Sequence, residues 1–174
     1  MLVGGPGTGK TSIVNKLDEL GYACFHEISR HVTLEAQKEG IEQLFLEDPI
    51  LFSKKLLEGR EQQYLKANSL ENDLIFFDRG IPDVLAYLVF SNSNYPSVFK
   101  EKSNQYKYDT IFHFKPWEKI HETDNERYES FEETQKIDHY LVKTYTSLNY
   151  NLITVPFDSI ENRVDFILNT IKNS

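Results

Sequence analysis

The chain alternates between short apolar runs and longer stretches in which apolar residues recur at helical spacing. The apolar runs have the length and near-continuity of parallel strands buried on both faces, and they cover residues 22–26, 74–77, 110–114 and 152–155. The stretches between them predict helices at about residues 10–20, 28–38, 48–68, 82–90, 130–148 and from 158 onward. Strands and helices that alternate in this way indicate a parallel α/β sheet.

Residues that typically begin or end helices support these boundaries. Gly21 and Gly40 stand where a helix C-terminal glycine is expected. Three pairs of residues have the spacing of helix N-terminal signals, namely Asp48 with Pro49, Ser130 with Glu133, and Asp158 with Glu161. No internal repeat or linker divides the chain, so we expect a single domain over residues 1–174.

A glycine-rich polar stretch follows the first apolar residues and satisfies the phosphate-binding pattern G-x-x-x-x-G-K-[ST]. It reads Gly4-Gly5-Pro6-Gly7-Thr8-Gly9-Lys10-Thr11, with Ser12 next. Glycines let backbone N–H groups converge on phosphate oxygens, and the helix that begins at Lys10 adds its positive dipole end. Lys10 can reach the β- and γ-phosphates, and the Thr11 hydroxyl can ligate Mg²⁺. We therefore expect Gly4–Ser12 to bind ATP with Mg²⁺.

The strand that feeds this loop has only Met1, Leu2 and Val3 available. Strands usually have about five to six residues. Either this strand is short or further residues precede Met1.

Composition and charge limit the classes of partner. Aromatic residues at 13% and apolar residues at 40% predict a packed globule, and the net charge of −8 argues against nucleic-acid binding. Cys24 is the only cysteine, which excludes an internal disulfide and favours a reducing compartment. No run approaches the roughly 18 apolar residues of a membrane span. We expect a cytoplasmic protein with no membrane or nucleic-acid partner.

Three polar residues stand at the expected strand ends, where α/β sheets bind ligands. Asp78 is a candidate Mg²⁺ ligand or, alternatively, a helix cap. Arg79 can bind phosphate or form an ion pair with a carboxylate. Glu27 can serve as the general base for an acceptor hydroxyl, or as an acid that stabilises a helix N-terminus.

Further polar residues are weaker candidates. Arg30 shares a helical face with Glu27, and Arg60 shares one with Gln63, so these side chains can contact a substrate. Asp83 is a similar candidate on the next predicted helix. Arg127 lies in a polar connection at about residues 115–130, which can form a lid over the transferring phosphate, or can be a solvated loop.

Together these segments resemble the P-loop kinase-like AAA-type ATPase family related to the ribosylnicotinamide kinase domain of the bacterial NadR regulator. The matching segments are Gly4–Thr11, Glu27-x-x-Arg30, Phe76–Gly80 followed by Asp83 and Ala86-Tyr87, Tyr108-Asp109, Arg127–Ser130, and Val155-Pro156 with Glu161-x-Arg163. The resemblance implies a P-loop NTPase fold with a five-stranded parallel sheet ordered 2-3-1-4-5, helices on both faces and a lid. It also implies a base-contacting role for Gln63, whereas a lid with Arg127 as its only arginine departs from related kinases.

The leading hypothesis is an Mg²⁺- and ATP-dependent kinase for a nucleoside-like or other small hydroxylated acceptor. In it Lys10 and Arg79 stabilise phosphate charge, Thr11 and Asp78 hold the metal, and Glu27 is the base. Arg127 closes with the lid. The alternative is a regulatory switch that binds or slowly hydrolyses ATP or GTP and acts on a protein partner.

Overall fold

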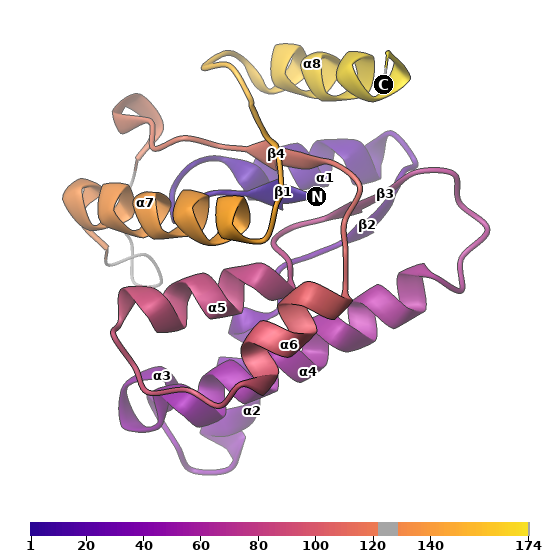
Figure 1. Ribbon diagram of the computed structural model, residues 1–174. Helices are drawn as coiled ribbons and strands as arrows, with labels where there is room; N and C mark the ends of the chain where they lie inside the picture. The colour runs from indigo at the N-terminus through magenta and orange to yellow at the C-terminus, as the bar shows by residue number, and fades with distance from the viewer. Residues whose placement is uncertain (122–128, 174) are drawn as a thin grey trace.

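The computed structural model of the chain describes residues 1–121 and 129–173 (Figure 1). Its strands are β1 (Leu2–Val3), β2 (Ala23–Phe25), β3 (Ile75–Phe77), β4 (Ile111–His113) and β5 (Leu152–Thr154). Its α-helices are α1 (Lys10–Glu19), α2 (Ser29–Lys38), α3 (Leu44–Glu47), α4 (Pro49–Ala67), α5 (Ile81–Phe90), α6 (Val98–Gln105), α7 (Phe131–Ser147) and α8 (Ile160–Lys172). A short 3₁₀ helix, η1, covers Glu118–Ile120. None of the helices in the two described ranges combines the length and the apolar character needed to cross a membrane.

All strand pairs are parallel, and hydrogen bonding divides the strands into two groups. One group has the order β1-β4-β5, and the other pairs β2 with β3. A parallel bridge between Leu2 and Asp78 joins the groups, because the backbone N–H of Arg79 donates to the Leu2 carbonyl at 3.0 Å. The spatial order is therefore 2-3-1-4-5, as the family resemblance implies.

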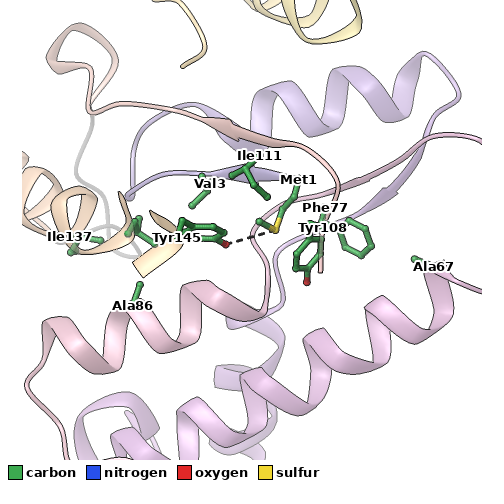
Figure 2. Close-up of a cluster of buried hydrophobic side chains, with 10 residues drawn as sticks. Met1, Val3, Ala67, Phe77, Ala86, Tyr108, Ile111, Ile137 and Tyr145 are labelled. Atoms are coloured by element: carbon green, nitrogen blue, oxygen red, sulfur yellow. Dashed lines mark hydrogen bonds between the residues drawn. The ribbon is translucent and has the colours of Figure 1, made fainter. Parts of the chain in front are cut away.

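Helices cover both faces of this sheet, as Figure 1 shows, with α1 and α8 on one face and α5 and α7 on the other. The alternation of side chains along a strand produces the two layers. Leu2 packs with the residues of α1 and α8, whereas Val3 packs with those of α5 and α7. Figure 2 shows the second cluster, in which Tyr145 of α7 lies next to Met1.

The helices α2, α3, α4 and α6 pack with α5 in a third apolar cluster beside the sheet. Its buried members include Val32, Leu44, Leu57 and Phe99.

The predicted helix starts are mostly confirmed. Asp48 accepts a hydrogen bond from the Leu51 N–H at 2.9 Å, and Ser130 forms a capping box with Glu133. The last helix differs, because its N-cap is Ser159 and not Asp158; the Ser159 hydroxyl accepts from the Asn162 N–H.

Two helices have no counterpart in the sequence prediction. The helix α3 has four residues, too few for a periodic pattern to be visible. The helix α6 buries only Phe99 and Ser103, so its eight residues appear polar in the sequence. Both lie in the third cluster, where tertiary packing decides the local structure.

Candidate functional site

A cavity of about 2350 Å³ lies along the carboxyl ends of the strands. Its lining includes residues shortly after the end of every strand, namely Pro6, Glu27, Asp78, Trp117 and Phe157. It continues over the faces of α2 and α4 that present Arg30 and Phe52. Ligands of open α/β sheets bind at this edge, so the cavity is the candidate site.

The loop between β1 and α1 borders this cavity over Pro6–Ser12. Gly7 and Gly9 have φ values of 67° and 82°, which favour glycine, and a Cβ at Gly9 would approach Arg163 to 2.8 Å. The Lys10 ammonium donates to the Gly5 carbonyl at 2.7 Å and to the Thr8 hydroxyl at 3.1 Å. These neutral acceptors bind the Lys10 N–H donors that would otherwise bind a phosphate.

Lys10 is nearly inaccessible, with 5% of its surface exposed. Burial, reinforced by the charge of Arg79, lowers the pKa of Lys10 to about 7 although Asp78 opposes the shift. A bound polyanion would restore the charge of the ammonium group. The loop is therefore a site whose charge state depends on its ligand.

Asp78 and Thr11 meet beside the loop, where the Thr11 hydroxyl donates to Asp78 Oδ2 at 3.2 Å. Asp78 Oδ1 is buried and makes no hydrogen bond with any described residue. Burial raises the pKa of Asp78, because it outweighs the opposing charges of Lys10 and Arg79. A divalent cation at this oxygen would provide the missing partner.

The residues present suit Mg²⁺, which needs only one or two protein ligands, better than a metal ion whose ligands are all protein side chains. Residues 1–121 and 129–173 contain no group of three or more His, Cys, Asp or Glu side chains arranged to hold a metal ion. Mg²⁺ commonly takes one or two carboxylates and completes its shell with water and substrate phosphate oxygens. Asp78 and Thr11 fit that requirement.

Glu27 lies between two arginines at the end of β2. Its carboxylate forms ion pairs with Arg60 at 3.1 Å and with Arg79 at 2.5 Å, and it accepts the backbone N–H groups of Ile28 and Ser29. Burial alone would raise the pKa of Glu27, but the two guanidinium charges outweigh it and lower the pKa to about 2. The carboxylate is thus ionised and held in one orientation.

Arg60 and Gln63 lie on the same face of α4 but in different environments. Arg60 is 5% exposed, and besides the Glu27 carboxylate it binds the Gly80 carbonyl, with Nη1 donating at 2.8 Å. Gln63 donates to the His26 carbonyl at 2.8 Å and does not line the cavity. The helix α4 therefore directs Arg60 into the cavity and Gln63 to the backbone just after β2.

Arg79 has a backbone φ of 70°, which is uncommon for a residue with a side chain. This conformation turns the guanidinium toward Glu27, Asp83 and Tyr87. Asp83 is fully buried and does not line the cavity. The strained turn after β3 thus presents Arg79 at the cavity and places Asp83 behind it.

The remaining predicted residues divide between the cavity and the undescribed segment. Ser12 and Arg30 line the cavity. Arg127 lies outside the described residues. Of the predicted lid over residues 115–130, the described part includes η1, whose Lys119 and Ile120 line the cavity.

Trp117, Phe157 and Arg163 line the cavity but were given no site role from the sequence, although Arg163 belongs to a segment that carries the family resemblance. Trp117 and Phe157 stack with ring centroids 5.1 Å apart, and the Arg163 guanidinium lies over the Phe114 ring at 4.8 Å. Arg163 also donates to the Thr8 carbonyl at 3.0 Å, so it connects α8 to the loop. The available signal was that Trp117 and Phe157 each closely follow a strand.

Solved structures with the same fold carry nucleotides. A deoxyadenosine kinase from M. mycoides, with products dCMP and a flexible dCDP bound, has a TM-score of 0.70 at 17% identity, covering 99% of this chain and 98% of that one. The same kinase with bound dCTP gives 0.69 at equal identity and coverage. The YorR protein of Bacillus subtilis, in complex with phosphorylated GDP, gives 0.51 at 14% identity, covering 98% and 94%.

These likenesses, at low identity, establish the α/β fold of P-loop nucleoside kinases. No curated protein matches the sequence. The model of the AAA domain family matches residues 1–163, which include the loop, Glu27, Asp78, Arg79 and Arg163. The chain belongs to the AAA domain family of P-loop proteins.

Proposed function

We propose that the protein is an Mg²⁺-dependent kinase that transfers the γ-phosphate of ATP to a hydroxyl of a nucleoside-like or other small acceptor. The observation that carries the proposal is the shared cavity of the phosphate loop and the Glu27–Arg60–Arg79 cluster. A protein that only binds nucleotide has no need of an oriented carboxylate beyond the phosphates. A kinase needs such a group beside the acceptor hydroxyl.

The size of the cavity supports two ligands. Ligand pockets usually measure about 300–1,000 Å³, and this one has about 2350 Å³. Its part next to the loop would hold the triphosphate. Its part under α2, α3 and α4 has apolar and aromatic walls, which include Phe45, Phe52 and Leu56. Flat rings bind well to such walls, so a nucleoside-like acceptor suits this part, in keeping with the deoxyadenosine kinase of the same fold.

The chemistry assigned to the residues is a single displacement. The acceptor oxygen forms a bond to the γ-phosphorus, the bond from that phosphorus to the β,γ-bridging oxygen breaks, and ADP leaves with the electron pair. Glu27 accepts the hydroxyl proton. Lys10 and Arg79 stabilise charge on the phosphate oxygens.

Glu27 is a weak base while both arginines hold its pKa near 2. When Arg79 turns its charge toward a bound phosphate, Glu27 retains Arg60 alone, and its basicity rises. In this proposal Glu27 becomes an effective base only after a bound phosphate has drawn the charge of Arg79 away. Proton abstraction by Glu27 is therefore limited while ATP is absent.

Thr11 would hold the metal ion through its hydroxyl, and Asp78 through Oδ1, which has no hydrogen-bond partner among the described residues. When bound, Mg²⁺ supplies positive charge to the β- and γ-phosphate oxygens. The stacked pair of Trp117 and Phe157 offers an aromatic surface for the base of the nucleotide. Arg127 belongs to the proposal as a lid residue that closes over the phosphates.

The test is ATP-dependent phosphorylation of a panel of nucleosides and riboside cofactor precursors, followed by ADP release and mass spectrometry of the products. We expect acceptor-dependent ADP release for at least one compound. Lys10→Ala should strongly weaken nucleotide binding, whereas the surface variant Lys16→Ala in the same helix should leave binding unchanged. Glu27→Gln should bind ATP and fail to transfer. ATP hydrolysis at a rate that no acceptor changes, and that persists in Glu27→Gln, would favour the regulatory switch instead.

A further inference from the structure

A buried chain of one hydrogen bond and one longer ion-pair contact connects α7 to Arg79 from behind the cavity. The Tyr145 hydroxyl donates to Asp83 Oδ2 at 2.5 Å, and Asp83 Oδ1 lies 3.6 Å from Arg79 Nη1. The Tyr145 hydroxyl is also 3.8 Å from the Met1 sulfur, a contact drawn in Figure 2. The carboxylate oxygen is closer and is the stronger acceptor, so the hydrogen bond of the Tyr145 hydroxyl goes to Asp83 and not to the sulfur.

Asp83 is held in place by neutral donors. Its Oδ2 accepts both the Tyr145 hydroxyl and the Gly80 N–H at 2.9 Å, while its Oδ1 makes no hydrogen bond with any described residue. A fully buried carboxylate without sufficient partners is costly and will rotate toward the nearest cation if it can. That cation is Arg79.

The Tyr145 hydroxyl is protonated at neutral pH. Burial, followed by the adjacent charge of Asp83, raises the pKa of Tyr145 well above its usual range. The hydroxyl is therefore a permanent donor. With the Gly80 N–H it restrains Oδ2, and Oδ1 stays outside hydrogen-bond distance of Arg79.

This restraint affects how Arg79 divides its contacts. Arg79 Nε pairs with Glu27 at 2.5 Å, whereas its contact with Asp83 is a looser 3.6 Å. Without the Tyr145 hydroxyl, Asp83 can turn toward Arg79 and compete with Glu27 for the guanidinium. The geometry points to Tyr145 as a positioning residue: through Asp83, it keeps the Arg79 guanidinium at the cavity, where it pairs with Glu27 until a bound phosphate replaces that carboxylate.

The helix α7 also borders the phosphate loop, because Thr134 lies against Gly5 and Glu133 lines the cavity. The same helix therefore contacts the loop near its N-terminus and supports Arg79 near its C-terminus. Neither Tyr145 nor Asp83 needs to touch a substrate for this role. The catalytic consequence rests on the proposed kinase function, but the effect on Arg79 does not.

The first test observes the side-chain Nε–H signal of Arg79 by NMR after labelling with ¹⁵N-arginine. The chain contains five arginines, so the spectrum holds few signals. Arg79→Lys identifies the Arg79 Nε–H signal by its loss. In Tyr145→Phe we expect that signal to shift and its exchange with water to accelerate about tenfold, since a hydrogen bond to a charged group is disrupted. Tyr150→Phe is the matched control, because its hydroxyl accepts from the Tyr108 N–H and does not touch Asp83. An unchanged Arg79 signal in folded Tyr145→Phe would overturn the inference.

Asp83→Asn provides a second variant should Tyr145→Phe not fold, and it should shift the same signal. The kinetic test measures kcat and KM. We expect kcat to fall by about tenfold in Tyr145→Phe, with KM values within about twofold of wild type. Adding Tyr145→Phe to Arg79→Lys should cause no further fall in kcat. Additive losses in the double variant would contradict a role through Arg79. A wild-type protein that phosphorylates nothing would defeat the kinase proposal alone, because the NMR result stands without activity.

Discussion

Arg60 Nη2 lies 3.1 Å from Glu27 Oε1, and this ion pair links the middle of α4 to the end of β2. Arg60 also holds the Gly80 carbonyl, so one guanidinium connects the ends of β2 and β3. Because Arg60 is almost fully buried, the pair is a fixed part of the site and not a surface contact. The proposed base is therefore oriented before any ligand binds.

Glu27→Gln should destabilise the fold at neutral pH. The change leaves Arg60 and Arg79 without their common carboxylate, and removing one partner of a buried pair costs about 3 kcal/mol. Urea unfolding at pH 7 measures the free energy of unfolding. Glu61→Gln is a comparison on the same helix as Arg60, since Glu61 pairs with Lys102 at the less buried edge. An equal loss of unfolding free energy in Glu27→Gln and Glu61→Gln would contradict the larger contribution of the buried Glu27 ion pairs to stability.

The same pair predicts an acid dependence of stability. The pKa of Glu27 falls from its ordinary value of 4.5 to about 2 on folding. Its stabilising contribution is therefore complete above about pH 4.5 and is lost as the pH falls toward 2. The difference in unfolding free energy between wild type and Glu27→Gln should shrink over this range. A difference that stays constant down to pH 2 would show that the ion pairs do not lower the pKa.

Nucleotide affinity should weaken at alkaline pH. Lys10 loses its proton above about pH 7 in the free protein, and a triphosphate binds only the charged form well. Each further pH unit should lower the affinity for ATP by up to about tenfold. Calorimetry between pH 6 and 9 measures it. Lys10→Ala should bind weakly with no such slope, and a flat wild-type profile would count against the buried ammonium as the phosphate ligand.

Asp78→Asn should separate metal binding from stability. Burial raises the pKa of Asp78, so replacing its carboxyl with a neutral amide should leave the melting temperature unchanged or higher. The strengthening of ATP binding by Mg²⁺ should fall by about tenfold or more. Asp73→Asn, on an exposed turn before β3, serves as the control. Retention of the full Mg²⁺ effect in Asp78→Asn would exclude Asp78 as a ligand.

Trp117 offers a direct signal for the base of the nucleotide, since it is the only tryptophan of the chain. ATP should change its fluorescence, whereas inorganic triphosphate, which has no base, should bind the loop with little change. Trp117→Ala should weaken ATP binding by about tenfold, a magnitude typical of one stacked base. Equal signals from ATP and inorganic triphosphate would place the base elsewhere.

The sequence was most informative where function depends on local backbone and strand ends. The phosphate loop is a continuous segment, and Glu27 and the pair Asp78-Arg79 each come directly after a predicted strand. The parallel order of the strands brings these ends to one edge, so their convergence on one cavity could be expected. The sequence left open whether Arg79 meets phosphate or a carboxylate, and in the structure its partners are Glu27 and Asp83.

The buried charges were harder to predict, because a charged residue on a helix usually faces solvent. A signal was present for Arg60, which lies three and four residues after the buried Leu57 and Leu56. Asp83 likewise stands within the apolar helix α5, a setting that favours burial over substrate contact. The short or polar helices α3 and α6 carry no comparable signal.

In the proposed function, Glu27 is the general base for an acceptor that binds in the same cavity as ATP. The most direct measurement is the formation of phosphorylated acceptor and ADP from ATP and Mg²⁺, compared between wild type and Glu27→Gln at equal nucleotide occupancy. We expect equimolar ADP and phosphorylated acceptor for wild type. For Glu27→Gln we expect transfer to be slower by about a hundredfold or more, the order expected for loss of a general base. ADP formation that is indifferent to every acceptor and equal in the two proteins would contradict it.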